Sequence, residues 1–310
     1  PLAVDLCKVA LWIEGHSGGK PLTFLDHRIR CGDSLVGVFD LSVLEDGIPD
    51  AAFDPVSGDD RKFASAIKKR NKREREDQHV GTLALSWGDE PDSPLAIRHS
   101  LLATPDDTPD DIHRKREAFT EWERAVHDQR MACHLWTAAF FWPLTAPHPR
   151  PPDSPSPLVE RGPGGEVPTT ATLRRFLQNP DSVDARLRGH AWALGERNRF
   201  FHWPLEFPEV FAPHPRPSDA PSPQVERGAG GEVSGGFDCI LSNPPWDQLQ
   251  LDPKEFFKTR DAEVAAGRNM AETERLIEKL IERAPSLYNE YRQAQAENDY
   301  TKKFIHASGR

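Results

Sequence analysis

The stretch that decides the predicted fold is Phe237-Asp-Cys-Ile-Leu-Ser-Asn-Pro-Pro-Trp246. In its first half, four apolar residues make a run of strand length: Phe237, Cys239, Ile240 and Leu241. Glycines precede this run and two prolines follow it. The run predicts a short buried strand, and Asn243 follows where that strand ends. Ligands of open α/β sheets bind just beyond the carboxyl ends of strands, so the pattern favours an α/β fold with a site at Asn243.

The turn after this run has chemistry that suits an amino group on a flat heterocycle. Pro244 and Pro245 lack N–H groups and stiffen the backbone, so the turn presents carbonyl acceptors. The side-chain oxygen of Asn243 and the carbonyl of Pro244 could accept both hydrogens of an exocyclic amine and localise its lone pair. Trp246 could stack on a base that has left the duplex. The alternative is an ordinary turn, because Asn-Pro often opens turns.

The segment Phe237–Trp246 resembles the catalytic segment of adenine-N6 DNA methyltransferases that use S-adenosylmethionine. The similarity is greatest to the large single-chain methylases of type IIG restriction–modification systems and related phage-exclusion systems. Three further stretches are similar to the same family: Pro1–Lys8, Phe24–Gly37 and Phe201–Phe211. The resemblance implies a Rossmann-like core in which the Asn-Pro-Pro-Trp residues, Asn243, Pro244, Pro245 and Trp246, are catalytic.

The resemblance also implies where the cofactor binds. It assigns Asp33 and Ser34 to the S-adenosylmethionine site, with the Asp33 carboxylate accepting a hydrogen bond from the adenine amine. The alternative is that Asp33 caps the turn that follows it. The ribose-binding acid and the glycine-rich loop of the family would precede Pro1. We therefore expect a fragment that lacks this part of the cofactor site and is inactive by itself.

The predicted domain organisation is a partial methyltransferase core with a large helical insertion. The core residues are expected at 1–40, the insertion at 41–211, and the catalytic strand and loop at 235–260. A helical segment at 261–310 is expected to lead towards a target-recognition region that the sequence does not include.

Two Pro-rich segments, 146–168 and 212–234, interrupt this organisation. Residues 146–167 and 212–233 differ at only four pairs of positions and carry no apolar periodicity. Such segments cannot build a core, so we expect two exposed, disordered inserts. The alternative is a proline-rich motif that binds a partner.

Apolar residues at helical spacing predict several helices: Pro1–Glu14, Arg61–Arg75, Ile112–Phe140, Thr170–Gln178, Val183–Asn198, one around Leu276–Ile281 and one that begins at an N-cap Ser286. We expect the aromatic residues of Ile112–Phe140 to pack in a core. The helix Arg61–Arg75 is strongly basic, and two interpretations stay open: phosphate binding or a solvated face.

The composition restricts the partners that the chain can have. A net charge of −10 confines any DNA contact to local basic patches. Four cysteines without C-x-x-C spacing predict buried, reduced thiols in a cytoplasmic protein, with no disulfide and no metal site. No apolar run reaches membrane-spanning length. His202 could be mistaken for a base, but amine methylation does not require one, so a structural role is expected.

We therefore expect a site-specific DNA methyltransferase that transfers a methyl group from S-adenosylmethionine to adenine N6 by base flipping. Its partners would be double-stranded DNA and other components of a restriction–modification or phage-defence system. Two alternatives stay open. A protein-glutamine N-methyltransferase would share the four-residue motif, and a non-catalytic remnant would at most bind DNA.

Overall fold

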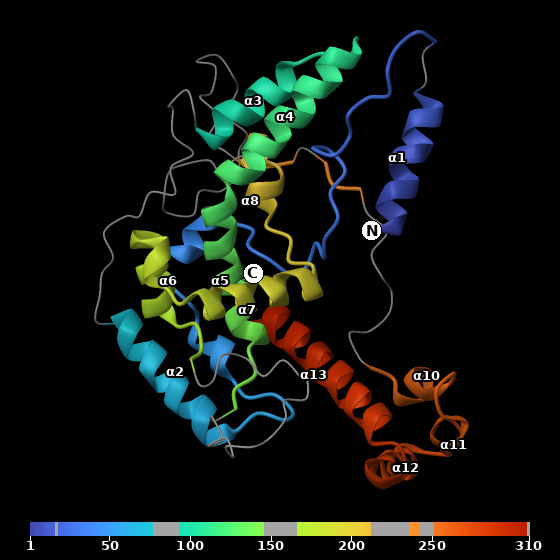
Figure 1. Cartoon of the computed structure of the whole chain (residues 1–310). Coiled ribbons are helices and arrows are strands. Elements are labelled where there is room, and N and C mark those ends of the chain that lie inside the picture. Colours follow the sequence, from blue (N-terminus) through green and yellow to red (C-terminus); the bar gives the residue numbers. More distant parts are fainter. Residues whose placement is uncertain are drawn as a thin grey trace, which may run out of the picture. The chain divides into compact units, whose positions relative to one another are not determined.

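The computed structural model describes residues 1–15, 18–76, 93–145, 166–211, 236–237, 239–241 and 251–308. Helices and connecting loops make up these ranges (Figure 1). The α-helices are α1 (Leu2–Glu14), α2 (Arg61–Glu76), α3 (Pro94–Ala103), α4 (Pro109–Ala125), α5 (His127–Phe141), α6 (Thr170–Gln178), α7 (Ala185–Asn198), α8 (Trp203–Glu206), α9 (Pro208–Phe211), α10 (Pro253–Phe257), α11 (Ala262–Ala265), α12 (Met270–Arg283) and α13 (Pro285–Ala307). Three short 3₁₀ helices are η1 (Leu41–Leu44), η2 (Asp50–Phe53) and η3 (Pro180–Ser182).

The predicted α/β, Rossmann-like fold is wrong. Within the described ranges the chain forms no strand, and β pairing is limited to one isolated parallel bridge between Asp33 and Phe200. A buried strand needs neighbouring strands to bind its N–H and C=O groups, and the described ranges supply none. The described residues of the predicted catalytic strand are irregular instead, and Ile240 and Leu241 are 75% and 93% exposed.

The chain divides into two compact units whose segments alternate along the sequence. Unit 1 consists of residues 1–47, 78–137 and 172–241, and unit 2 consists of residues 48–77, 138–171 and 242–310.

In unit 1, α3 and α4 lie side by side (Figure 1). Their starts are well determined by the sequence, since Ser93 caps α3 and Thr108 forms a capping box with Asp111 at the start of α4. Trp122 of α4 is fully buried, and the Arg98 guanidinium lies 5.0 Å from its ring. The first part of α5 packs closely against α7, because a Cβ at Gly195 would lie 2.6 Å from the His134 ring.

In unit 2, the buried side chain of Asn71 joins α2 to neighbouring segments by hydrogen bonds. The Asn71 amide nitrogen donates to the Ile48 carbonyl and to the Asp50 side chain, both at 2.8 Å. Its oxygen accepts from the backbone and the hydroxyl of Thr170, both at 2.9 Å. A separate cluster joins α10 to α13 through the buried side chains of Phe257, Val264, Ile277, Leu280 and Tyr291.

Most of the predicted helices are confirmed, with differences at their ends. The helix Thr170–Gln178 has the predicted bounds, α2 extends one residue further, to Glu76, and α1 ends at Gly15 as expected. The single helix predicted over Ile112–Phe140 is wrong, because α4 ends at Ala125 and α5 begins at His127. Its apolar residues do pack in the core as predicted, including Trp122, Met131 and Leu135. The last helix begins at Pro285 after an N-cap at Ala284, and not after Ser286.

Two other expectations need correction. All four cysteines are free, as predicted, but Cys133 alone is buried, and Cys7, Cys31 and Cys239 are exposed. For Cys31 and Cys239 the predicted burial rested on strands that do not form, whereas Cys7 lies on α1, which forms but has no buried residue. The Pro-rich segments lie outside the described residues except for 166–168, where Val167 is buried although exposure was expected. Within the described ranges, no helix combines the length and the apolar character that a membrane span requires.

Candidate functional site

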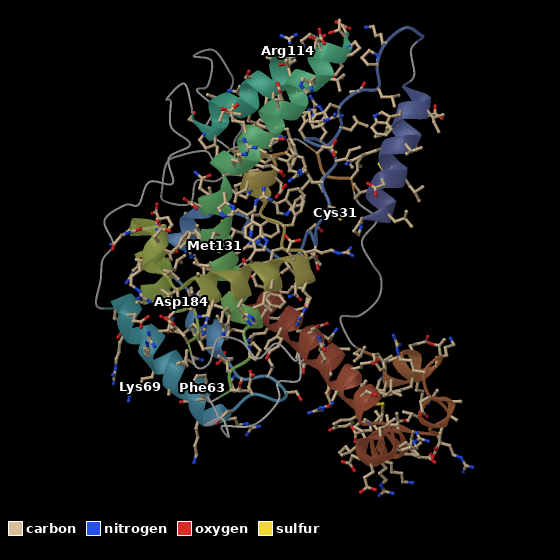
Figure 2. The ribbon with its side chains drawn as sticks, in the orientation of Figure 1. Cys31, Phe63, Lys69, Arg114, Met131 and Asp184 are labelled. Atoms are coloured by element: carbon tan, nitrogen blue, oxygen red, sulfur yellow. The ribbon has the colours of Figure 1, made fainter. Side chains whose placement is uncertain are left out.

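The predicted site residues fall into two groups. The catalytic residues Asn243, Pro244, Pro245 and Trp246 lie outside the described residues. The predicted cofactor residues Asp33 and Ser34 are described and belong to unit 1. The candidate site is therefore built around these two residues, close to Cys31, which is labelled in Figure 2.

Residues 33–37 form a strip that includes Asp33 and Ser34. Backbone hydrogen bonds join this strip to the aromatic-rich segment that follows α7. The Asp33 N–H donates to the Arg199 carbonyl at 2.8 Å, and the Phe201 N–H donates to the Val36 carbonyl at 2.8 Å. A Cβ at Gly37 would lie 2.0 Å from the Phe201 carbonyl oxygen. Only glycine allows two backbones to approach this closely, because it has no side chain. Gly37 and the two hydrogen bonds therefore fix the position of the strip.

Asp33 occupies the turn at the start of this strip. Its Oδ1 accepts a hydrogen bond from the Leu35 N–H at 2.9 Å, and its carbonyl accepts from the Val36 N–H at 3.0 Å. The turn-capping alternative is thus present in the structure. Within the described residues, Oδ2 accepts no hydrogen bond, so half of this partly buried carboxylate remains able to bind a donor.

An aromatic cluster connects Ser34 to the start of the predicted catalytic segment. The Trp203 indole N–H donates to the Ser34 carbonyl at 3.1 Å. The Trp203 ring lies 5.6 Å from the Phe237 ring at an interplanar angle of 79°, an edge-to-face contact. Phe237 also makes edge contacts, each at 5.7 Å, with the rings of Phe207 and Phe211. Because Phe237 is 39% exposed, the cluster presents an aromatic face to solvent.

Two glutamates, Glu206 on α8 and Glu209 on α9, form ion pairs with arginines at the helical end of this aromatic segment. Glu206, which is nearly buried, accepts from the Arg30 Nε at 2.5 Å and lies 3.4 Å from the Arg130 guanidinium. Glu209 accepts from two nitrogens of the fully buried Arg98, at 2.9 and 3.0 Å. Buried arginine–carboxylate pairs of this kind hold geometry more than they add net stability. They hold in place α8 and α9, which carry Trp203 and Phe211 of the aromatic cluster.

Two buried histidines, His134 and His202, form a hydrogen-bonded pair at this segment. The Val38 N–H donates to His202 Nδ1 at 3.0 Å, so in the neutral ring the proton is on Nε2. Nε2 is 2.7 Å from His134 Nδ1 and donates to it, which leaves the His134 proton on Nε2, facing Gly195. Burial lowers the pKa of His134 to about 3, with a smaller effect of the Arg130 charge, and it lowers that of His202 well below the ordinary value. The predicted structural role of His202 is confirmed.

The structure thus brings together three of the four stretches on which the resemblance rests. Residues of Phe24–Gly37, Phe201–Phe211 and the described start of Phe237–Trp246 share one aromatic and hydrogen-bonded assembly in unit 1. The sequence did not predict the central role of Trp203, although the many aromatic residues around it were evident. It also missed His134, because nothing in the sequence links that residue to a histidine far along the chain.

Neither protein-family models, nor curated proteins, nor solved structures gave a match to this chain.

Proposed function

We propose that this chain carries base- and cofactor-recognition residues of an adenine-N6 DNA methyltransferase that uses S-adenosylmethionine. The observation that supports this most directly is the bridge made by Trp203 between Ser34 and Phe237. It joins the segment assigned to the cofactor with the segment that leads to Asn243. The proposal does not depend on a Rossmann-like sheet, and it rests on the motif and on this local arrangement.

The residues around Asp33 fit a ligand that has an amino group on a flat ring. Asp33 Oδ2 can accept a hydrogen bond, and the exposed ring of Phe39, six residues further along the chain, lies 6.1 Å from the Trp203 ring. Asp33 and Ser34 would hold the adenine of S-adenosylmethionine, which supplies the methyl group when bound. The cytoplasm, where DNA and this cofactor are both present, is the proposed location.

The Asn-Pro-Pro-Trp motif would act on the target adenine. The Asn243 side-chain oxygen and the Pro244 carbonyl would accept the two hydrogens of the N6 amine, which would localise its lone pair and orient the amine for methyl transfer. Pro245 keeps the turn rigid, and Trp246 stacks on the flipped base. Transfer of the methyl group would form a new N–C bond at N6 and break the methyl–sulfur bond of the cofactor, and water would take the proton that N6 then loses.

The test is methyl transfer from labelled S-adenosylmethionine to duplex DNA by the full-length protein. Asn243→Ala removes one of the two acceptors, and we expect the rate to fall by about 100-fold or more, as for other lost donors or acceptors at a reacting centre. Ser242→Ala, one residue away, is the matched control and should keep most of the activity.

Full activity in the Asn243→Ala variant would contradict the proposed role of the motif. Transfer to glutamine-containing peptides in place of DNA would instead assign the protein to the methylases of glutamine side chains. Restriction or phage-defence components remain the proposed partners only if DNA is the substrate.

A further inference from the structure

Helix α2 is the most basic element of the described chain. Its sixteen residues include eight lysines or arginines and two glutamates: Arg61, Lys62, Lys68, Lys69, Arg70, Lys72, Arg73, Arg75, Glu74 and Glu76. One face carries the buried residues Ala64, Ile67 and Asn71. The Asn71 hydrogen bonds hold this face firmly in unit 2. The helix is therefore a rigid support for whatever its other face binds.

Four of the basic residues on the flanks of α2 are already engaged with carboxylates. These ion pairs are Lys68 with Asp54 at 2.5 Å, Arg70 with Glu74 at 2.7 Å, Arg75 with Asp50 at 3.7 Å and Lys72 with Glu76 at 3.9 Å. They neutralise four of the eight cations, and the remaining positive charge belongs to Arg61, at the start of the helix, and to three residues on its outward side.

Three cations on the outward side of α2 have no such partner. Lys62, Lys69 and Arg73 are exposed, and within the described residues none of them forms an ion pair or a side-chain hydrogen bond. They are seven and four residues apart, about two turns and one turn, so they share one stripe opposite the buried face. Figure 2 shows Lys69 projecting outward from α2.

We propose that this outward stripe of Lys62, Lys69 and Arg73 binds the phosphate backbone of duplex DNA. A chain with a net charge of −10 is repelled by DNA over most of its surface, so binding requires a local patch of unpaired cations. Phosphates release condensed counterions when such cations approach, which supplies the affinity. The choice of duplex DNA as the partner rests on the proposed function, and the stripe itself does not.

The test compares two triple variants of the full-length protein with the same change of charge. The first is Lys62→Gln, Lys69→Gln and Arg73→Gln. The control is Arg268→Gln, Arg275→Gln and Lys279→Gln, at three exposed cations of unit 2 near or on α12. Fluorescence anisotropy with two unrelated labelled duplexes, over a range of salt concentrations, gives the slope of log K against log salt for each protein.

The stripe variant should bind both duplexes more weakly and lose about 3 from the magnitude of the salt slope, about one for each phosphate contact. The control should keep the wild-type slope, and circular dichroism should show native helix content in all three proteins. An unchanged slope in the stripe variant, an equal loss in the control, or a wild-type protein that binds neither duplex would overturn the inference. Asn243→Ala should retain the full salt slope, so a failure of methyl transfer can be told apart from a failure of this binding surface.

Discussion

His27 is a buried titratable residue whose side chain forms no hydrogen bond within the described residues. Its ring stacks on Phe24 at 5.6 Å, with an interplanar angle of 11°. Burial lowers its pKa to about 4, and the nearby charges of Arg98, Arg28 and Lys115 contribute. His134 and His202 have lowered pKa values for the same principal reason.

These pKa values determine how stability should depend on pH. In the unfolded chain the three histidines take up protons near pH 6.5, whereas in the folded chain His27 does so only near pH 4 and His134 near pH 3. Between these limits the unfolded chain binds more protons, so the free energy of unfolding decreases as the pH falls. The contribution of the three residues is complete above about pH 6.5.

His27→Phe should make the protein less sensitive to acid. Phenylalanine keeps the stack on Phe24 and removes a titratable group without breaking a side-chain hydrogen bond. We expect the slope of the unfolding free energy between pH 6.5 and pH 4 to decrease by up to about one proton, or about 1.4 kcal/mol per pH unit. Urea unfolding at a series of pH values measures this slope. His99→Gln, at an exposed histidine, is the control, and a slope that His27→Phe leaves unchanged would contradict the assignment.

At the level of single elements, α1 shows that the helical spacing of apolar residues predicts a helix but does not predict that the helix is buried. Its apolar residues recur at helical spacing, and the helix forms, but none of its residues is buried. Two contacts hold it: Lys8 forms an ion pair with Asp26 at 2.6 Å, and the Trp12 indole donates to the Thr23 carbonyl at 2.8 Å. A helix of this length is marginal in isolation, so these contacts matter.

Trp12→Ala should therefore loosen α1 selectively. Loss of the hydrogen bond and of the ring contact should raise the hydrogen-exchange rates of the α1 amides by about tenfold, since each 1.4 kcal/mol of lost stability corresponds to that factor. Amides of α4 and α5 should be unaffected. Leu6→Ala, which truncates an exposed side chain, is the control. Equal effects of the two substitutions would mean that Trp12 does not anchor the helix.

The break between α4 and α5 is a second case at this scale. Val126 lies at the junction, is fully buried and has φ −91° and ψ 4°. No glycine or proline lies at this position. The helical spacing of apolar residues therefore continues across it, and the sequence predicts a single helix. The break therefore occurs at a buried residue and without a local sequence signal.

At the scale of the whole molecule, the described chain has more than one core. The buried residues of the cluster around Phe257 in unit 2 come from α10, α11, α12 and α13. Phe257 contacts Tyr291 at 5.0 Å between ring centroids and is fully buried. A core of this kind can lose stability without the rest of the chain unfolding.

Phe257→Ala should destabilise this cluster by about 3–5 kcal/mol, the usual cost of truncating a buried phenylalanine. Hydrogen exchange should become faster in α10 and α12, while α4 and α7 of unit 1 keep their wild-type protection. Met270→Ala, at an exposed position of α12, should have little effect. A uniform loss of protection in both units would show that they unfold as one.

The sequence by itself determined where most helices form, because helical hydrogen bonds and caps join residues within four positions of one another. The bounds of α6, the extent of α2 and the end of α1 at Gly15 were readable for that reason. It also marked Asp33, Ser34 and the aromatic segment Phe201–Phe211 as candidates.

The remaining features depend on contacts between distant segments. The run at Phe237–Leu241 has strand composition, but a strand exists only where distant segments offer backbone partners, and none does so in the described ranges. Burial follows the same rule: Cys133 is covered by other elements, and Cys7 and Cys31 are not. The contacts of His134 with His202, and of Trp203 with both Ser34 and Phe237, likewise depend on folding, since each joins residues far apart in the chain.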